Sequence, residues 1–449
     1  MNYKTISVGV FFDGTGNNGP NAASLRKPDK NNESYYGAAT NIYKLFSLFN
    51  GDEKIYIEGI GTVTGSEDQD FAIATSKNPA GISGYSSDDK LEKAFSFVRN
   101  LPCSEATEYH FYVYGFGRGA MLARHFCYEL LRECSEFSGL AVKVKFLGVF
   151  DTVESSAFSN HEVAILPETE RVLQIGALNE CRFFFPLTGL SEDSKEKNDT
   201  CFVTEHSVWK EVFVPGAHAD VGGGYLEGSQ SVYVSPAFTE NRELFYYMEN
   251  IRATMVDAEG DKIWDDLLSG YGVDYDGVSS QAYIAKEWVY NELPKVYGQL
   301  MIAETNTQKL VFRTDFSPSD FEIEECEHPC LVELSKNLQQ YVQTLSPDRK
   351  PVYHYAMLSD YTHISANFGL YHEALLQHPR GTAFAEFINN GLNVPGHSSD
   401  QYHKNGSRSQ SEIHHIEDSV VDYAYGTNIP NNDQWNRTIL MKESLYNKC

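Results

Sequence analysis

Short apolar runs alternate with amphipathic stretches along the first half of the chain. Each run is continuous and rich in β-branched or aromatic residues, as expected for strands buried in a sheet; the runs span residues 5–12, 54–60, 109–114, 142–150 and 209–214. Apolar residues at helical spacing predict helices over residues 39–49, 88–99, 120–131 and 171–180. Because strands and helices alternate, we expect an α/β fold with a mostly parallel sheet flanked by helices.

The pattern is weaker beyond about residue 230. Helices are predicted over residues 240–268 and 288–304, and an exposed loop over 396–413. We therefore expect three regions: a core over residues 1–229, a largely helical cap or insertion over 230–350, and a C-terminal part over 351–449 that completes or decorates the core.

The composition is that of a folded and strongly acidic protein. Hydrophobic residues make up 41% and aromatic residues 13% of the 449 residues, which argues against disorder. The formal net charge of −26 would repel the phosphates of nucleic acid and favours basic partners. The same charge opposes approach to anionic membranes, although it leaves room for a local apolar contact.

Neither a targeting segment nor a metal site is predicted. The N-terminus has no basic region followed by an apolar core and a cleavage site, and no apolar run approaches the roughly 18 residues of a membrane span. We therefore expect a soluble protein that is made in the cytoplasm. The eight cysteines are too few for a disulfide scaffold. Cys326 and Cys330 flank His328, but without a second ligand pair an ordinary loop is favoured over a metal centre.

One stretch carries a chemical motif. The strand at 109–114 leads through Gly115-Phe116-Gly117-Arg118-Gly119 directly into the helix at 120–131. A strand, a tight glycine turn and a helix form the context of a nucleophile elbow, G-x-S-x-G, in which the turn lifts a serine hydroxyl above a hydrolase sheet. Gly117 occupies the position of that serine. The sequence therefore predicts the scaffold of a hydrolase without its attacking atom.

Two more polar residues follow buried strands in the order that this chemistry requires. Asp151 follows the strand at 142–150 and His218 follows the strand at 209–214, and α/β hydrolases place nucleophile, acid and histidine in that order. His218 would act as general base, and Asp151 would hold its tautomer and stabilise the imidazolium. Taken singly, each is also an ordinary turn or loop residue, but their shared place after strands favours one common site.

The oxyanion donors are predicted at the two turns beside this site. They would be the backbone N–H of Arg118 and an N–H from the loop at Gly14 and Thr15. Asp13 and Asp220 are expected to support the site.

A different class of protein competes for the same turn. Residues 115–120 also match G-x-G-x-x-A, the dinucleotide-binding fingerprint. The motif lies more than 100 residues into the sheet instead of at its first crossover, and no acidic residue ends a strand about 20 residues later. The dinucleotide-binding enzyme therefore remains the weaker alternative.

Several separate blocks resemble one known family. In order along the chain they resemble the α/β-hydrolase lipase domain of type VI secretion phospholipase effectors; the blocks are FFDGTGNN (11–18), YGFGRGAMLAR (114–124), GVFDTV (148–153), ALNECRFFF (177–185) and VPGAHADVGGGY (214–225). The resemblance covers about residues 5–225, with a weaker echo in YTHISANFG (361–369).

The resemblance implies phospholipase or carboxylester hydrolase chemistry without a cofactor, with Asp151 and His218 as acid and base. The family pattern at the turn is G-F-S-R-G, from which Gly117 departs. The chain is thus expected to be inactive as written, either as a lipase disarmed by replacement of its serine or as a natural pseudo-hydrolase that binds lipid or protein.

The resemblance also implies where the protein acts and with what. It implies a phospholipid substrate, transient contact with a membrane surface, a cognate immunity protein, a secretion-apparatus carrier, and delivery into a target cell by a type VI system. Aromatic residues of the predicted cap then fit two roles, contact with acyl chains or packing of the cap onto the sheet; they are Phe245, Tyr246, Tyr247 and Trp264.

Overall fold

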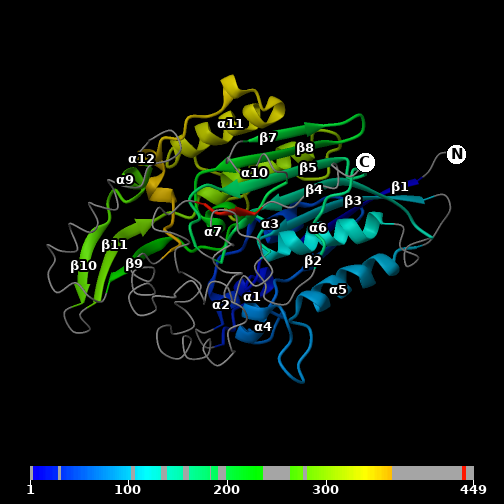
Figure 1. Ribbon diagram of the computed structural model, residues 1–449, viewed down its shortest axis with the longest axis horizontal. Helices are drawn as coiled ribbons and strands as arrows, with labels where there is room; N and C mark the ends of the chain where they lie inside the picture. The colour runs from blue at the N-terminus through cyan, green and yellow to red at the C-terminus, as the bar shows by residue number, and fades with distance from the viewer. Residues whose placement is uncertain are drawn as a thin grey trace, which may run out of the picture.

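A seven-stranded sheet forms the centre of the molecule (Figure 1). The computed structural model describes residues 4–28, 32–102, 107–132, 139–154, 161–182, 184–190, 199–235, 263–276, 281–366 and 437–440. The strand order is β2-β1-β3-β4-β5-β8-β7. Neighbours are parallel except at the edge, where β7 runs antiparallel to β8. The predicted α/β fold with a mostly parallel sheet is therefore confirmed.

The strands are short and most of their residues are buried. They are β1 (Lys4–Phe12), β2 (Glu53–Ile57), β3 (Thr107–Phe116), β4 (Ala141–Phe150), β5 (Arg171–Ala177), β7 (Thr200–Val203) and β8 (Val208–Val214). In β1, Val8 and Val10 belong to the core on one face of the sheet, and Phe11 belongs to the core on the other. Successive side chains of a strand point to opposite faces, so both faces must be covered.

Helices supply that cover on both sides. On one face lie α5 (Ser87–Arg99) and α6 (Arg118–Leu131), and on the other lie α3 (Asn41–Leu48), α10 (Leu293–Thr305) and α11 (Pro329–Thr344). Short helices occupy the connections; they are α1 (Gly19–Ala22), α2 (Glu33–Tyr36), α4 (Asp70–Thr75), α7 (His218–Gly222) and α12 (Tyr355–Leu358).

The sheet reverses its order at β1, which lies between β2 and β3. The chain leaves β1 toward one edge and later continues on its other side, so the loops after β1 and β3 diverge. In open α/β sheets, ligands bind in the crevice that forms at the carboxyl ends of strands at such a switch point. All the residues that the sequence nominates follow the carboxyl ends of β1, β3, β4 or β8.

Residues 171–177 form strand β5, so the helix predicted over 171–180 is wrong. β5 lies between β4 and β8, and its residues after Arg171 are buried. A strand that is buried on both faces carries apolar residues at nearly every position, here Val172, Leu173 and Ile175. Such a run has no period of two to distinguish it from a buried helix.

A small antiparallel sheet occupies part of the region expected to be a helical cap. Its strand order is β10-β11-β9, with β9 (Gly228–Ser235), β10 (Gly272–Asp276) and β11 (Gln281–Val289). The prediction of a largely helical region over 230–350 is therefore wrong for these residues. Of the helix predicted over 240–268, only α9 (Ile263–Leu267) falls within the described residues.

The helix predicted over 288–304 begins later than expected. Trp288 still belongs to β11, and α10 starts at Leu293 with Pro294 in its first turn, a position that proline favours. α10 packs on the main sheet instead of forming a separate cap. The three region boundaries themselves stay a prediction.

A strand from near the end of the chain joins the core. β12 (Ile439–Leu440) pairs in parallel with β6 (Leu187–Thr188). β6 in turn lies beside the segment after β4, because the N–H of Thr188 donates to the carbonyl of Thr152 at 2.8 Å. Residues 437–440 therefore lie next to the carboxyl end of β4. The predicted loop over 396–413 lies outside the described residues.

Candidate functional site

The predicted nucleophile elbow is the tight turn at Gly117, between β3 and α6. Gly117 has φ 56° and ψ −123°, a backbone conformation that residues other than glycine adopt only under strain. α6 begins at the next residue, Arg118. The N–H of Gly117 donates to the carbonyl of Phe150 at 3.0 Å, and the carbonyl of Gly117 accepts from Val153 at 3.2 Å. The turn is thus fixed directly onto the carboxyl end of β4.

Close packing explains a second glycine of this turn. A Cβ at Gly119 would lie 2.2 Å from the carbonyl oxygen of Asp13, which no real contact allows. The start of α6 can therefore rest on the end of β1 only because residue 119 has no side chain. This contact brings the loop after β1 beside the elbow.

Gly117, Asp151 and His218 converge. His218 Nδ1 lies 2.6 Å from Asp151 Oδ2, and a Cβ at Gly117 would lie 2.8 Å from His218 Nε2. An ionised carboxylate can only accept, so Nδ1 carries the proton and Nε2 is left as an acceptor that faces residue 117. The imidazole occupies part of the space that a side chain at residue 117 would need.

The carboxylate of Asp151 is held by three donors. Oδ1 accepts from the N–H of Ala177 at 2.9 Å, and Oδ2 accepts from His218 and from Arg437 Nη2 at 2.9 Å. Burial alone would raise the pKa of Asp151, but the Arg437 guanidinium, followed by His218, outweighs it and holds the pKa below its ordinary value. Asp151 also has a positive φ of 45°, a strained backbone of the kind that clusters at functional sites.

His218 is enclosed between two aromatic rings. Phe116 stacks on the imidazole at 4.4 Å between ring centroids, and Phe185 meets it edge-on at 4.9 Å. Burial lowers the pKa of His218, although Asp151 opposes the shift. The imidazole is therefore neutral at neutral pH, as a general base must be.

A buried carboxylate fixes the backbone of His218. The N–H of His218 donates to Glu180 Oε2 at 3.1 Å, and the Arg182 guanidinium donates to both oxygens of Glu180 at 3.0 and 2.9 Å. Burial would raise the pKa of Glu180, but Arg182 lowers it to about 2. Arg182 also lies over the ring of Phe185 at 3.5 Å. Glu180 thus stays ionised and holds the start of α7.

Asp13 is buried and binds the first of the two turns that contain the predicted oxyanion donors, at Gly14. Its carboxylate accepts from Thr40 Oγ1 at 2.6 Å, from the Tyr56 hydroxyl at 2.5 Å and from the N–H of Gly14 at 2.8 Å. The N–H of Gly14 is therefore engaged and is not available to an oxyanion in this arrangement. Thr15 and Arg118 remain as the candidates for the predicted oxyanion donors; Arg118 is the first residue of α6.

Asp220 forms a second carboxylate–histidine pair, with His363. Asp220 Oδ2 accepts from the N–H groups of Ala217 and His363, both at 2.9 Å, and Oδ1 lies 2.7 Å from His363 Nδ1. Ser365 Oγ donates to Glu180 Oε1 at 2.9 Å. Residues 361–366 are thereby tied to α7 and to Glu180.

Sequence reasoning missed some of these residues as members of the site. Glu180 and Arg182 lie in one of the blocks that carry the family resemblance, and His363 lies in its weaker echo, so the blocks pointed to the right segments without giving roles. Arg437 follows no strand pattern or motif. Nothing in the sequence pattern around residue 437 predicts its contact with Asp151.

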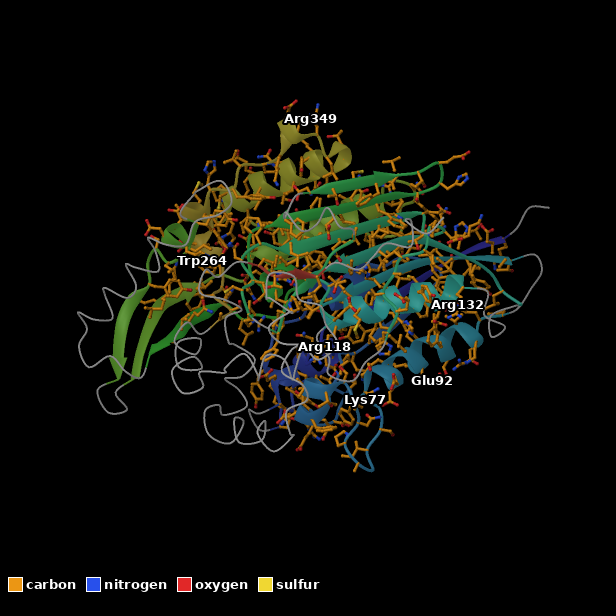
Figure 2. The ribbon with its side chains drawn as sticks, in the orientation of Figure 1. Lys77, Glu92, Arg118, Arg132, Trp264 and Arg349 are labelled. Atoms are coloured by element: carbon orange, nitrogen blue, oxygen red, sulfur yellow. The ribbon has the colours of Figure 1, made fainter. Side chains whose placement is uncertain are left out.

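Trp264 and His328 make none of the contacts described above. Trp264 is only 6% exposed and belongs to the small core under β9–β11 (Figure 2), so it packs that sheet; Phe245, Tyr246 and Tyr247 lie outside the described residues. His328 Nδ1 lies 3.0 Å from the Tyr361 hydroxyl. In the described ranges no three His, Cys, Asp or Glu side chains are grouped so as to hold a metal ion, and no described helix is both long and apolar enough to cross a bilayer.

A family comparison identifies the fold unit that carries this geometry. The catalytic-domain model of Tle1-like type VI secretion phospholipase effectors matches residues 7–135 and 129–241, more than half of the chain. The chain belongs to this family. All the residues around the elbow except His363, Ser365 and Arg437 fall within the matched Tle1-like segments.

A solved structure agrees at the level of the fold. The structure of the Tle1 effector bound to the VgrG spike of the type 6 secretion system is similar, with a TM-score of 0.57 and 18% sequence identity, over 81% of this chain and 85% of that one. An uncharacterized protein from Pseudomonas aeruginosa matches with a TM-score of 0.39 and 15% identity, over 96% of this Tle1-like chain and 65% of that one. A search of curated proteins finds no match.

Proposed function

We propose that this chain is the hydrolytic domain of a phospholipase effector whose Ser-Asp-His triad lacks its serine. The observation that carries the proposal is the distance of 2.8 Å between His218 Nε2 and the position of a Cβ at residue 117. One nitrogen of the imidazole binds a buried carboxylate, and the other faces a strained turn between a strand and a helix. This is the arrangement of a serine hydrolase without its nucleophile.

With serine at position 117, the chemistry follows from the geometry. His218 Nε2 takes the hydroxyl proton while Oγ attacks the carbonyl carbon of an ester, and it returns that proton to the leaving alcohol. Asp151 keeps Nδ1 protonated and stabilises the imidazolium. The N–H groups of Arg118 and Thr15 donate to the developing oxyanion. Water then repeats the sequence on the acyl-enzyme and releases the carboxylic acid.

The chain as written has no hydroxyl at residue 117, and we infer that it does not turn over. Loss of a triad nucleophile costs about 10⁶-fold in turnover in a well-studied serine protease. The same absence favours a second function, a pseudo-hydrolase whose site binds lipid or protein without cleaving it. We place the disarmed lipase first, because the acid, the base and their supporting contacts are all in place.

The proposed substrate and partners follow from the family. We propose a phospholipid ester as substrate, reached by transient contact with a membrane surface. A structurally similar Tle1 effector binds the VgrG spike, which supports a spike protein as the carrier of this chain. A cognate immunity protein and delivery into a target cell by a type VI system complete the proposal.

The test is restoration of the nucleophile. Gly117→Ser is expected to raise hydrolysis of phospholipid vesicles or short-chain esters by at least about 10³-fold over the parent chain. The imidazole must first retreat by a few tenths of an ångström to admit the new Cβ. Gly117→Ala is the matched control, because it introduces the same Cβ and the same backbone strain without a hydroxyl.

Two further outcomes decide between the candidates. Restored activity must disappear when His218→Ala is combined with Gly117→Ser. If folded Gly117→Ser protein is silent on every ester while the parent chain co-sediments with vesicles, the hydrolase proposal is wrong and the binding module is supported.

A further inference from the structure

The most unusual charged group beside the site is Arg437. Its side chain is 1% exposed, and that of Asp151 is fully buried. Arg437 Nη2 donates to Asp151 Oδ2, the same oxygen that binds His218 Nδ1. In the described residues, Arg437 Nε and Nη1 have no hydrogen-bond partner. A guanidinium is thus buried on the carboxylate of the site.

The segment 437–440 places the Arg437 guanidinium at Asp151. β12 follows Arg437 after one residue and pairs with β6, and the N–H of Leu187 donates to the carbonyl of Thr438 at 2.9 Å. β6 is itself bonded to Thr152, the residue after Asp151. The position of the guanidinium is therefore fixed by backbone pairing on both sides of β6, and not only by its own ion pair.

The two buried carboxylates that contact His218 are matched by two guanidiniums only when Arg437 is included. Two carboxylates, Asp151 and Glu180, are matched by two guanidiniums, Arg437 and Arg182. The next polar groups are Cys181, Asp220, Tyr225 and His363. Burial raises the pKa of the Cys181 thiol and of the Tyr225 phenol, so both groups are neutral. The Asp220 carboxylate is paired with His363. Without Arg437 the imidazole would sit beside one unmatched negative charge, which attracts a proton to it.

We propose that Arg437 is a positioning residue of the site: it fixes the Asp151 carboxylate and keeps His218 an unprotonated base. Arg437 and the imidazole both bind the Asp151 carboxylate. The positive charge of Arg437 therefore weakens the attraction by which Asp151 would favour protonation of His218 at Nε2. Because the pairing of β12 with β6 places Arg437, the protonation of His218 depends on residues 437–440 of the C-terminal part of the chain. The inference rests on the proposed function for its catalytic meaning, but the protonation of His218 can be measured without turnover.

The decisive experiment uses the chain as written. Histidine side chains are titrated by NMR in the parent and in Arg437→Gln, and the His218 signal is assigned by its loss in His218→Ala. The pKa of His218 is expected to rise by about one unit or more in Arg437→Gln, because removing a cation next to the carboxylate favours the imidazolium. Arg437→Lys keeps a positive charge and is expected to stay within about half a unit of the parent.

A matched control removes a guanidinium elsewhere. Arg171 pairs with the buried Glu304 at the opposite end of β5, and Arg171→Gln is expected to leave the His218 titration unchanged. An unchanged His218 pKa in folded Arg437→Gln protein would overturn the proposal, as would a full-unit rise in Arg437→Lys. If neither variant folds, Arg437 serves the fold alone and the proposal is wrong.

Activity gives an independent readout in the Gly117→Ser background. There Arg437→Gln is expected to move the acid limb of kcat to higher pH with little change in KM, since the base is protonated over a wider range. If Gly117→Ser shows no hydrolysis, the proposed function fails, whereas the NMR titration still decides the role of Arg437.

Discussion

At the scale of single residues, the site contains two neighbouring positions with unusual backbone angles. Gly117 and Asp151 both have positive φ angles, and the hydrogen bonds of Gly117 to Phe150 and Val153 hold the two turns together. A residue other than glycine in such a conformation costs about 1 to 3 kcal/mol. Glycine at position 117 avoids strain that a serine would carry, so Gly117→Ser is expected to lower the free energy of unfolding.

Asp13 should make stability depend on pH in an unusual direction. Burial raises its pKa to about 6 from the ordinary 3.8, against the lowering effect of hydrogen bonds from Thr40, Tyr56 and Gly14. Between about pH 4 and pH 6 the folded protein therefore binds a proton that the unfolded chain does not. The contribution of Asp13 to the free energy of unfolding must fall as pH rises through this window, by about 3 kcal/mol in total.

Denaturant unfolding at pH 4.5 and pH 6.5 measures this contribution. Between these two pH values, Asp13 is expected to lower the free energy of unfolding of the parent by about 2 kcal/mol, and Asp13→Asn should lack this fall. The exposed Asp88→Asn serves as the control for removal of a carboxylate. Equal pH dependence in the parent and in Asp13→Asn would contradict the prediction.

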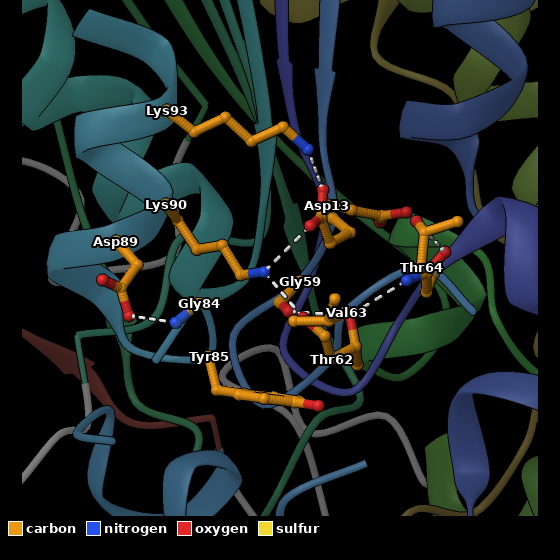
Figure 3. Close-up of polar contacts among 12 residues, drawn as sticks. Asp13, Gly59, Thr62, Val63, Thr64, Gly84, Tyr85, Asp89, Lys90 and Lys93 are labelled. Carbon is orange, nitrogen blue, oxygen red and sulfur yellow. Dashed lines mark hydrogen bonds and ion pairs between the residues drawn. The ribbon is translucent and has the colours of Figure 1, made fainter. Parts of the chain in front are cut away.

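At the scale of elements, α5 clamps the loops that border the site. Lys90 and Lys93 extend from α5 toward the segment that follows β2 (Figure 3). Lys90 Nζ donates to the carbonyl of Thr62 at 2.6 Å and lies 3.2 Å from Glu58 Oε1. The same segment accepts from the loop after β1, since the N–H of Gly16 donates to the carbonyl of Ile60 at 3.0 Å. The loop that carries Thr15 is thereby supported from α5.

Glu58 is the carboxylate on which this clamp depends. The side chains of Lys90 and Glu58 are 2% and 8% exposed, so Glu58→Gln leaves an ammonium buried without its counter-charge. The free energy of unfolding is expected to fall by about 3 to 5 kcal/mol in urea denaturation. Lys93 pairs with the same carboxylate but is 44% exposed, so Lys93→Gln is the control and should cost about 1 kcal/mol or less. Equal losses in the two variants would show that burial of Lys90 does not set the cost.

Some strands of the sheet could be predicted from the sequence and others could not. The strands β1, β3, β4 and β8 were predictable from their apolar runs, and so was the grouping of the polar residues that follow them, because parallel strands place their carboxyl ends at one edge. β5 was not, because Val172, Leu173 and Ile175 are buried on both faces and lose the alternation that identifies strands. Arg437 was out of reach for a different reason, since its contact with Asp151 spans 286 residues and local patterns carry no information about such pairs.

At the scale of the whole molecule, the net charge of −26 acts against the compact state. Raising sodium chloride from about 10 to about 150 mM shortens the Debye length from about 30 to about 8 Å and screens this repulsion. The thermal unfolding midpoint is therefore expected to rise with salt, while a non-electrolyte at the same osmolality should leave it nearly unchanged. A midpoint that falls with salt would mean that the paired charges dominate over the net charge.

The pairing of β12 with β6 also determines when, during synthesis of the chain, the site can be completed. Translation proceeds at about 5 to 20 residues per second, so the 286 residues between Asp151 and Arg437 take about 15 to 60 seconds to synthesise. During that interval a nascent chain holds the aspartate, and later the histidine, without the guanidinium. The polar network of the site is consequently finished only after residues 437–440 have left the ribosome.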